Sequence, residues 1–320
     1  KDSMSVLDLV DNRILFSVAT GRNPVELSVS PDKKYLLVAN KLDGTISAYF
    51  RQDRENIRDL GTFGNGENPT DVIFNNKGTE AYVAYQGEGR INFLSVLNRA
   101  MPVSKQVLNL KDESFKGKVS PFKLAISKDD NTLYSIDKDN GKLFVFKKQN
   151  NTFTQSNIIN LAINNEPVDL EDIIVNNDKI YISDSINSKI MVVDAINNTV
   201  INSISLLSKE IDSNIQPLPT KLAITSDNKK LYVTNRGTST IAVLDLEKNT
   251  LLKHISLSSK NADSALPTDI SIRPNGNIYI TNSSGRNLSI ISGKDDKLLR
   301  NIGTTPSAGF IPPLSAIKML

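Results

Sequence analysis

One unit repeats along almost the whole chain, and this repetition constrains the fold more than any other feature. Each unit opens with a proline followed by an apolar run, and successive prolines lie 45 to 52 residues apart. The opening residues are Pro24, Pro69, Pro121, Pro167, Pro219, Pro267 and Pro313. A period in this range predicts an architecture in which each unit buries its faces against its neighbours.

Residues 219–256 hold the clearest copy of the unit, which reads as four short strands. We expect strands over residues 222–225, 230–235, 240–246 and 250–255, because these runs are rich in Val, Ile, Leu, Thr and Tyr and are separated by Asn, Asp and Gly. Residues 241–244 are apolar at successive positions, so both faces of that strand must be buried against neighbours. Four strands in a repeat of this length predict one blade of a β-propeller.

The second strands of the units share a pattern, an aromatic or aliphatic residue followed by β-branched residues and a final Asn or Asp. An aromatic beside β-branched residues suits a buried strand, and a terminal Asn or Asp can bond the next turn. We therefore assign these residues to the fold. The clearest copies are Tyr134–Asp137, Tyr181–Asp184, Tyr232–Asn235 and Tyr279–Asn282.

The two ends of the chain each read as part of a unit. Val6-Leu7-Asp8-Leu9 matches Val243-Leu244-Asp245-Leu246, the third strand, and residues 313–320 resemble a first strand. The sequence thus predicts an all-β, seven-bladed β-propeller of four-stranded antiparallel blades, with the last blade split between the termini. Residues 1–320 form one domain on this interpretation, with blades over about 24–68, 69–120, 121–166, 167–218, 219–266, 267–312, and 313–320 with 1–23.

The second-strand motif resembles the YVTN-type β-propeller repeat family, most closely at residues 232–235 and 279–282. The same family's apolar-Asp and Asn-Thr pattern recurs at Val193-Asp194 and Asn198-Thr199. The resemblance covers residues 3–320 and implies a propeller; similar propellers occur in surface-layer and exported binding proteins and, more distantly, in lactonases. Departures occur at Leu37, at Tyr85 and in the fourth repeat, where residues 170–173 add residues before the first strand.

Composition narrows the functions. The net charge of +3 arises from 38 basic and 35 acidic residues spread along the chain, which argues against a nucleic-acid partner. Cysteine is absent and His254 is the only histidine, so we expect no metal or other cofactor and no histidine pair in catalysis. No run suggests a transmembrane segment. We expect a monomer, exported to the periplasm, the cell surface or the medium after removal of a targeting segment.

The residue two places after each opening proline is a candidate for the rim of the central channel. Three of these residues are acids separated by two lysines, a fourth acid lies beyond them, and three arginines lie in neighbouring loops. One interpretation is a site for a small polar ligand; the other is that opposite charges on a solvated rim pair with each other, with little net stabilisation. The candidate ligand-binding residues are Glu26, Asp71, Lys123, Asp169, Lys221, Asp269, Arg90, Arg236 and Arg286.

Other polar motifs have simpler explanations. Asp137–Gly141 resembles part of a calcium loop but lacks the later glutamate, so we predict a hairpin turn. His254 lies in an outer strand and is not expected to be catalytic, and we assign no catalytic residue. Longer segments between blades, where binding often resides, are residues 111–120 with Phe115, 207–218, 258–266 and 303–312.

The sequence favours a non-enzymatic binding or scaffold protein, which holds a partner protein or small polar ligand on its loop-rich face. One alternative is a lactonase-type hydrolase, in which carboxylates such as Asp71 and Asp269 position a metal or a water. Another is a passive surface-layer component. Repeated residues explain the fold, so the residues that differ between repeats carry the functional information.

Overall fold

The computed structural model describes residues 2–11, 13–97, 99–114, 117–162, 166–257, 265–303 and 317–318. Within them the chain forms β-strands and one short 3-10 helix, η1 (Gln86–Glu88). It divides into two compact units, Lys1–Ile159 and Asn160–Met319, which are described separately below. No helix among the described residues is long and apolar enough to cross a membrane.

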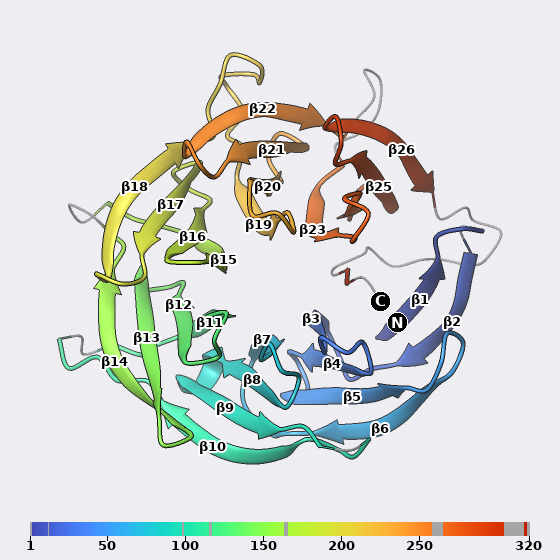
Figure 1. Ribbon diagram of the computed structural model, residues 1–320, viewed down its shortest axis with the longest axis vertical. Coiled ribbons are helices and arrows are strands. Elements are labelled where there is room, and N and C mark those ends of the chain that lie inside the picture. The colour runs from blue at the N-terminus through green and yellow to red at the C-terminus, as the bar shows by residue number, and fades with distance from the viewer. Residues whose placement is uncertain are drawn as a thin grey trace. The chain divides into compact units, whose positions relative to one another are not determined.

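The first unit contains a two-stranded sheet and three four-stranded antiparallel sheets, each with its strands in chain order (Figure 1). The pair is β1 (Ser3–Asp8) and β2 (Arg13–Ala19). The four-stranded sheets are β3 (Pro24–Val29), β4 (Tyr35–Asn40), β5 (Thr45–Arg51) and β6 (Ile57–Phe63); β7 (Pro69–Phe74), β8 (Glu80–Tyr85), β9 (Arg90–Ser95) and β10 (Val103–Asn109); and β11 (Pro121–Ile126), β12 (Thr132–Asp137), β13 (Lys142–Gln149) and β14 (Thr152–Asn160).

The second unit contains three more four-stranded antiparallel sheets of the same order. They are β15 (Leu170–Asn176), β16 (Lys179–Asp184), β17 (Lys189–Asp194) and β18 (Thr199–Ser205); β19 (Pro219–Ile224), β20 (Lys230–Asn235), β21 (Thr240–Asp245) and β22 (Thr250–Ser256); and β23 (Pro267–Ile272), β24 (Ile278–Asn282), β25 (Asn287–Ser292) and β26 (Lys297–Gly303). These six sheets are the blades that the repeat predicts. Below, they are numbered one to six in chain order.

Apolar layers between neighbouring blades form the core. Tyr35 and Leu37 of blade one pack with Val72 and Val83 of blade two, and comparable clusters join blades two and three, four and five, and five and six. The second strands are almost completely buried, as β20 shows from Leu231 onward. Burial on both faces explains why the middle strands are apolar at successive positions instead of alternating.

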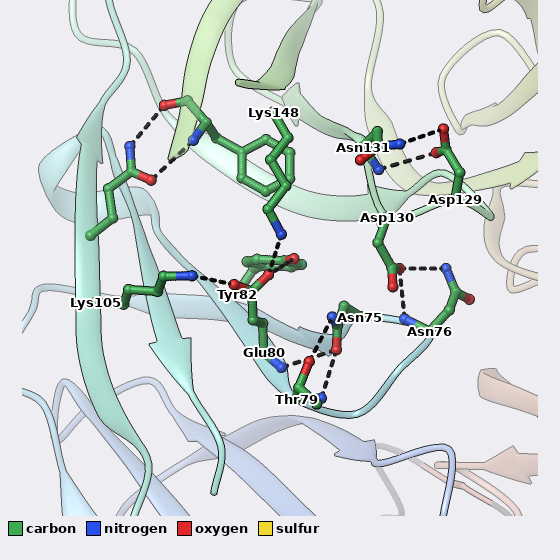
Figure 2. A network of polar contacts seen from close by, with 12 residues as sticks. Asn75, Asn76, Thr79, Glu80, Tyr82, Lys105, Asp129, Asp130, Asn131 and Lys148 are labelled. Carbon is green, nitrogen blue, oxygen red and sulfur yellow. Dashed lines mark hydrogen bonds and ion pairs between the residues drawn. The ribbon is translucent and has the colours of Figure 1, made fainter. Parts of the chain in front are cut away.

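Polar bridges also join blades two and three, and one of them centres on Glu80 of β8. Its carboxylate lies 2.6 Å from Lys105 Nζ of the same blade and 2.7 Å from Lys148 Nζ of the next blade, and it accepts a hydrogen bond from the Tyr82 hydroxyl at 3.1 Å (Figure 2). Burial raises the pKa of Glu80, but hydrogen bonds from both lysines outweigh it and leave the pKa below its ordinary value. The network stabilises a contact between blades.

The repeated second-strand tyrosine makes a similar bridge in the second unit. The Tyr232 hydroxyl of blade five donates to Asp296 of blade six, which also lies 2.7 Å from Lys230 Nζ. Tyr181 of blade four lies 3.4 Å from the side-chain oxygen of Asn249 in blade five. Burial raises the pKa of Tyr181 to about 12. The tyrosine therefore recurs because it joins blades.

The structure describes part of the blade that the sequence predicts to be split between the two ends of the chain. β1 and β2 pair with each other, and Met4 of β1 packs against Leu36 and Tyr49 of blade one. Of the first strand predicted over residues 313–320, only Ile317 and Lys318 lie among the described residues. The Ile317 amide donates to Asp269 Oδ2 at 2.7 Å, as the Leu124 amide donates to Asp71 Oδ2 at the start of blade three.

Candidate functional site

A β-bulge near the start of each first strand decides where the candidate residues point. The pairing register shifts directly before Glu26, Asp71, Lys123 and Asp269. A bulge re-aims the side chains that follow it. The structure places these four residues in the interior, each 1–5% exposed, instead of on a solvated rim.

Three of these residues meet in the first unit. Lys123 Nζ donates a hydrogen bond to Glu26 and lies 3.2 Å from Asp71 Oδ1, so one ammonium joins the first strands of three blades. The second carboxylate oxygen of Asp71 accepts the Leu124 amide at 2.7 Å. The arrangement matches the expectation that opposite charges pair, although the pairs are buried. Removing one partner of a buried ion pair is costly, so these residues have a structural role.

In blade four the extra residues before β15 change which acid occupies this position. Asp172 faces Ser183 on the second strand, as Asp71 faces Ala84, and its carboxylate accepts the Leu222 amide at 2.9 Å. Asp169, which the sequence suggested, lies before β15 and accepts a hydrogen bond from Ser185 Oγ at 2.5 Å. The equivalent residue of blade four is therefore Asp172.

The remaining candidates lie in both units and are described one by one. Arg90 lies over the Tyr85 ring at 4.6 Å, is ion-paired with Glu88 and donates to Asn92 at 3.0 Å. Arg236 and Arg286 are exposed in the turns after β20 and β24, and Lys221 is half-buried in β19. Tyr85, which departs from the repeat, fills the space beside Arg90, and burial raises its pKa to about 12.

A cavity of about 420 Å³ opens in the first unit, at the end of the blades where the first strands begin. The turn at η1 forms one wall, and the segments before and after the undescribed residues 115–116 form the others. Leu110 and Val119, both buried, supply an apolar surface. The charged residues that line the cavity are Glu88, Lys111, Asp112, Glu113 and Lys118.

Local structure holds this cavity in shape. Gly89 has φ +65°, and a Cβ there would lie 2.8 Å from the carbonyl oxygen of Val119. Only glycine adopts that conformation with little strain. The Gln155 side chain accepts the Lys111 amide at 3.1 Å and donates to the Lys111 carbonyl at 2.6 Å. These contacts position the segment that carries the charged lining.

The carboxylates of the cavity differ in their surroundings. Asp112 is ion-paired with Lys142 and accepts hydrogen bonds from Ser114, and the Lys142 hydrogen bond is the main reason that its pKa is lowered. Glu88 is ion-paired with Arg90. Glu113, Lys111 and Lys118 are exposed. The arrangement offers ammonium groups as donors and Glu113 as a solvent-accessible carboxylate.

The Asp137–Gly141 motif, which the sequence predicts to be a hairpin turn, lies at the end of β12 and in the turn that follows. Asp137 ends β12 and accepts hydrogen bonds from the Ser120 and Asn140 amides at 3.0 and 3.1 Å; burial raises its pKa. The described residues contain no group of three or more His, Cys, Asp or Glu side chains arranged to hold a metal ion. Phe115, residues 258–264, and residues 304–316 lie outside the described residues, so the segments predicted there are not placed.

The fold and the sequence together define the class of protein. Six four-stranded sheets and the β1–β2 pair are the architecture of an all-β propeller with four-stranded antiparallel blades. The chain belongs to the family described as lactonase, 7-bladed beta-propeller, which matches residues 17–309. The broader part of the resemblance, to lactonase-like propellers, is confirmed, whereas the YVTN-type assignment stays a prediction.

Solved structures support the same fold. A protein from Lactobacillus plantarum is 17% identical with a TM-score of 0.76, over 98% of this chain and 93% of that one. The periplasmic gluconolactonase of Pseudomonas aeruginosa is 16% identical with a TM-score of 0.70, over 93% and 91%. Apo AztD from Citrobacter koseri is 13% identical with a TM-score of 0.69, over 95% and 92%. Curated protein sequences give no match.

Proposed function

We propose that the protein is a lactonase-type hydrolase that opens a small polar cyclic ester in the cavity beside η1. The observation that carries the proposal is membership of the lactonase propeller family across residues 17–309. The cavity of about 420 Å³ supports it, since small-molecule sites are clefts of roughly 300–1,000 Å³. A sugar lactone is a neutral ring with several hydroxyl groups, which suits the mixed carboxylate and ammonium lining.

The lining supplies the two groups that ester hydrolysis needs. Glu113 acts as the general base that takes a proton from the water attacking the carbonyl carbon, and it returns that proton to the ring oxygen as the ring C–O bond breaks. The ammonium of Lys118 stabilises the negative charge that develops on the carbonyl oxygen. Asp112 is the weaker base, because its ion pair with Lys142 lowers its pKa.

This site differs from the one the sequence suggested for the hydrolase alternative. Asp71 accepts a hydrogen bond from the Leu124 backbone amide, on the first strand of the next blade, and Asp269 accepts one from the Ile317 amide. Both aspartates are buried, at 1–3% exposed. A substrate reaches a cavity more readily than a buried ion pair. We therefore assign the hydrolase role to the cavity.

The test measures acid release from gluconolactone and related sugar lactones, after subtraction of spontaneous ring opening. We expect turnover by the wild type and a loss of about 100-fold or more in kcat for Glu113→Gln, the size of a general-base contribution. Glu247→Gln, at an exposed turn residue of blade five, is the matched control and should leave the rate unchanged. No turnover above the spontaneous rate would overturn the proposal, and full activity of Glu113→Gln would overturn the assignment of the base.

Binding without hydrolysis is the second candidate for the same cavity. It would use the same lining, in which Glu88 and Asp112 are ion-paired and Glu113 is exposed, and it differs from hydrolysis in that no acid is released. Calorimetric titration with gluconolactone distinguishes the two: saturable binding with no acid release supports a binding protein. The same titration would detect binding of a partner protein, but it requires a known partner. The small ligand is therefore tested first.

We also infer that the protein acts outside the cytoplasm. The support is the likeness of its fold to the periplasmic gluconolactonase of Pseudomonas aeruginosa. Fractionation of the native cells checks this, and recovery in the cytoplasmic fraction would contradict it. The monomeric state stays a prediction, which light scattering of the purified chain would check.

A further inference from the structure

The hairpin turn between β12 and β13 also holds the cavity segment, residues 111–114 and 117–120. The buried carboxylate of Asp137 accepts a hydrogen bond from the Ser120 amide at 3.0 Å. The Asn140 side-chain amide donates to the Lys118 carbonyl at 3.0 Å and to Asp137 Oδ2 at 2.8 Å. The turn therefore fixes the main chain on the side of the cavity segment that carries Lys118.

The lysine that follows this turn holds the other side of the cavity segment. Lys142 begins β13 and is ion-paired with Asp112, whose side chain is 3% exposed. The Asp112 carboxylate also accepts hydrogen bonds from the amide and the hydroxyl of Ser114, at 3.0 and 2.6 Å. Such a bond from an aspartate to the amide two residues on closes a tight turn. Lys142 thus fixes a carboxylate that in turn fixes the main chain on either side of Glu113.

Blade four contains the same hairpin turn, at residues that do not line this cavity. Asn187 donates to Asp184 at 2.8 Å and to a main-chain carbonyl of the preceding segment at 2.9 Å, which repeats the two bonds of Asn140. Lys189 takes the place of Lys142 in the register and lies 3.7 Å from Asp184 of its own turn. The two asparagine bonds therefore belong to the repeat, whereas the ion pair of Lys142 with the cavity segment is particular to blade three.

We propose that the β12–β13 turn positions both chemical groups of the cavity. Lys142, acting through Asp112, sets where Glu113 lies. Asn140, acting through the main-chain carbonyl, sets where Lys118 lies. The inference rests on the proposed function, in which these two groups are the general base and the ammonium that stabilises the carbonyl oxygen. A strand hairpin holds such groups more precisely than a loop does, and a displacement of about 1 Å can cost about 100-fold in rate.

Blade four supplies matched controls for each positioning residue. Asn140→Ala and Asn187→Ala remove the same two hydrogen bonds from equivalent turns, so they should destabilise folding to a similar extent. Lys142→Met and Lys189→Met each remove an ammonium and keep an unbranched side chain. Lys142→Arg keeps the charge, and we expect it to keep the ion pair with Asp112.

Gluconolactone turnover by the full chain gives the first measurement, with the folded fraction of each variant taken from circular dichroism. Per folded molecule, Lys142→Met and Asn140→Ala should lower kcat about 10- to 100-fold and leave KM within about threefold, because the displaced groups act on the transition state. Lys142→Arg should recover most of the rate, and the two blade-four variants should keep the wild-type kcat. Equal losses in the two blades, or a loss in Lys142→Arg as large as in Lys142→Met, would overturn the proposal.

Hydrogen exchange separates a failure of this inference from a failure of the proposed function. Lys142→Met should accelerate exchange of residues 111–114, and Asn140→Ala that of residues 117–120, whereas the blade-four variants should change neither. If the wild type opens no lactone, the proposed function fails, and the exchange rates still decide whether the turn holds the cavity segment. Unchanged exchange in both blade-three variants would overturn the positioning role even if the wild type opens lactones.

Discussion

Replacement of Asp71 by alanine tests whether the buried first-strand carboxylates hold the blades together. The change removes the acceptor of the Leu124 amide and one of the two carboxylates that pair with Lys123 among the described residues, while Glu26 remains. A buried amide left without a partner costs about 1–3 kcal/mol, and the loss of one partner from a buried ion pair adds to this. We expect a loss of about 3 kcal/mol in the free energy of unfolding.

Urea denaturation of the full chain, followed by circular dichroism, measures this loss. Asp71→Asn keeps an oxygen for the Leu124 amide and should lose about 1 kcal/mol. Glu55→Ala, at an exposed turn residue, should change the free energy by no more than about 0.5 kcal/mol. If Asp71→Ala stays within that limit as well, the buried carboxylate does not stabilise the blade contact and the reasoning fails.

Three further predictions follow from contacts within the units. Tyr232→Phe removes the hydrogen bond to Asp296 and should lower the free energy of unfolding by about 0.5–1.5 kcal/mol, whereas Tyr279→Phe, which has no hydroxyl bond among the described residues, should be near neutral in urea denaturation. The pKa of Glu80 is lowered in the folded protein, so its contribution to the free energy of unfolding is present above pH 4.5, its ordinary pKa, and is lost as pH falls through the folded pKa. The unfolding midpoints of the wild type and Glu80→Gln should therefore converge in acid. A difference that stays constant with pH would contradict this. Gly89→Ala forces a side chain at φ +65° against Val119 and should cost about 1–2 kcal/mol and reduce lactone turnover; unchanged stability would show that the turn adapts.

Much of the fold could be predicted from local pattern. The pattern of residues 230–235 predicts a strand, and these residues form β20. The repetition of the tyrosine at their centre predicts a role in the fold, and its hydroxyl bonds Asp296 of the next blade. The pattern succeeds because strand propensity, turn residues and burial on both faces agree in every repeat.

The candidate site was harder to predict because it depends on departures from the repeat. A β-bulge directs Glu26 and Lys123 inward. A bulge of one residue does not change the apolar pattern of the strand, so the sequence does not predict it. In blade four, extra residues shift the register, so that Asp172 and not Asp169 takes the position equivalent to Asp71. These are tertiary features that residue spacing alone does not specify.

One feature of the sequence indicates the segment that lines the cavity. Residues 111–120 read as a longer segment between blades, and the repeat that contains them spans 52 residues, more than most others. Its shape depends on the conformation of Gly89 and on the bonds from Gln155. The bonds from Gln155 could not be read from the repeat, because they join blade three to the segment after β10, and the close approach of Gly89 to Val119 depends on how that segment folds back.

The rate of gluconolactone opening by the purified full chain tests the central claim most directly. The account predicts enzymatic acid release that saturates with substrate, falls about 100-fold in Glu113→Gln and is unchanged in Glu247→Gln. A rate equal to spontaneous ring opening, for gluconolactone and for related sugar lactones, would contradict it.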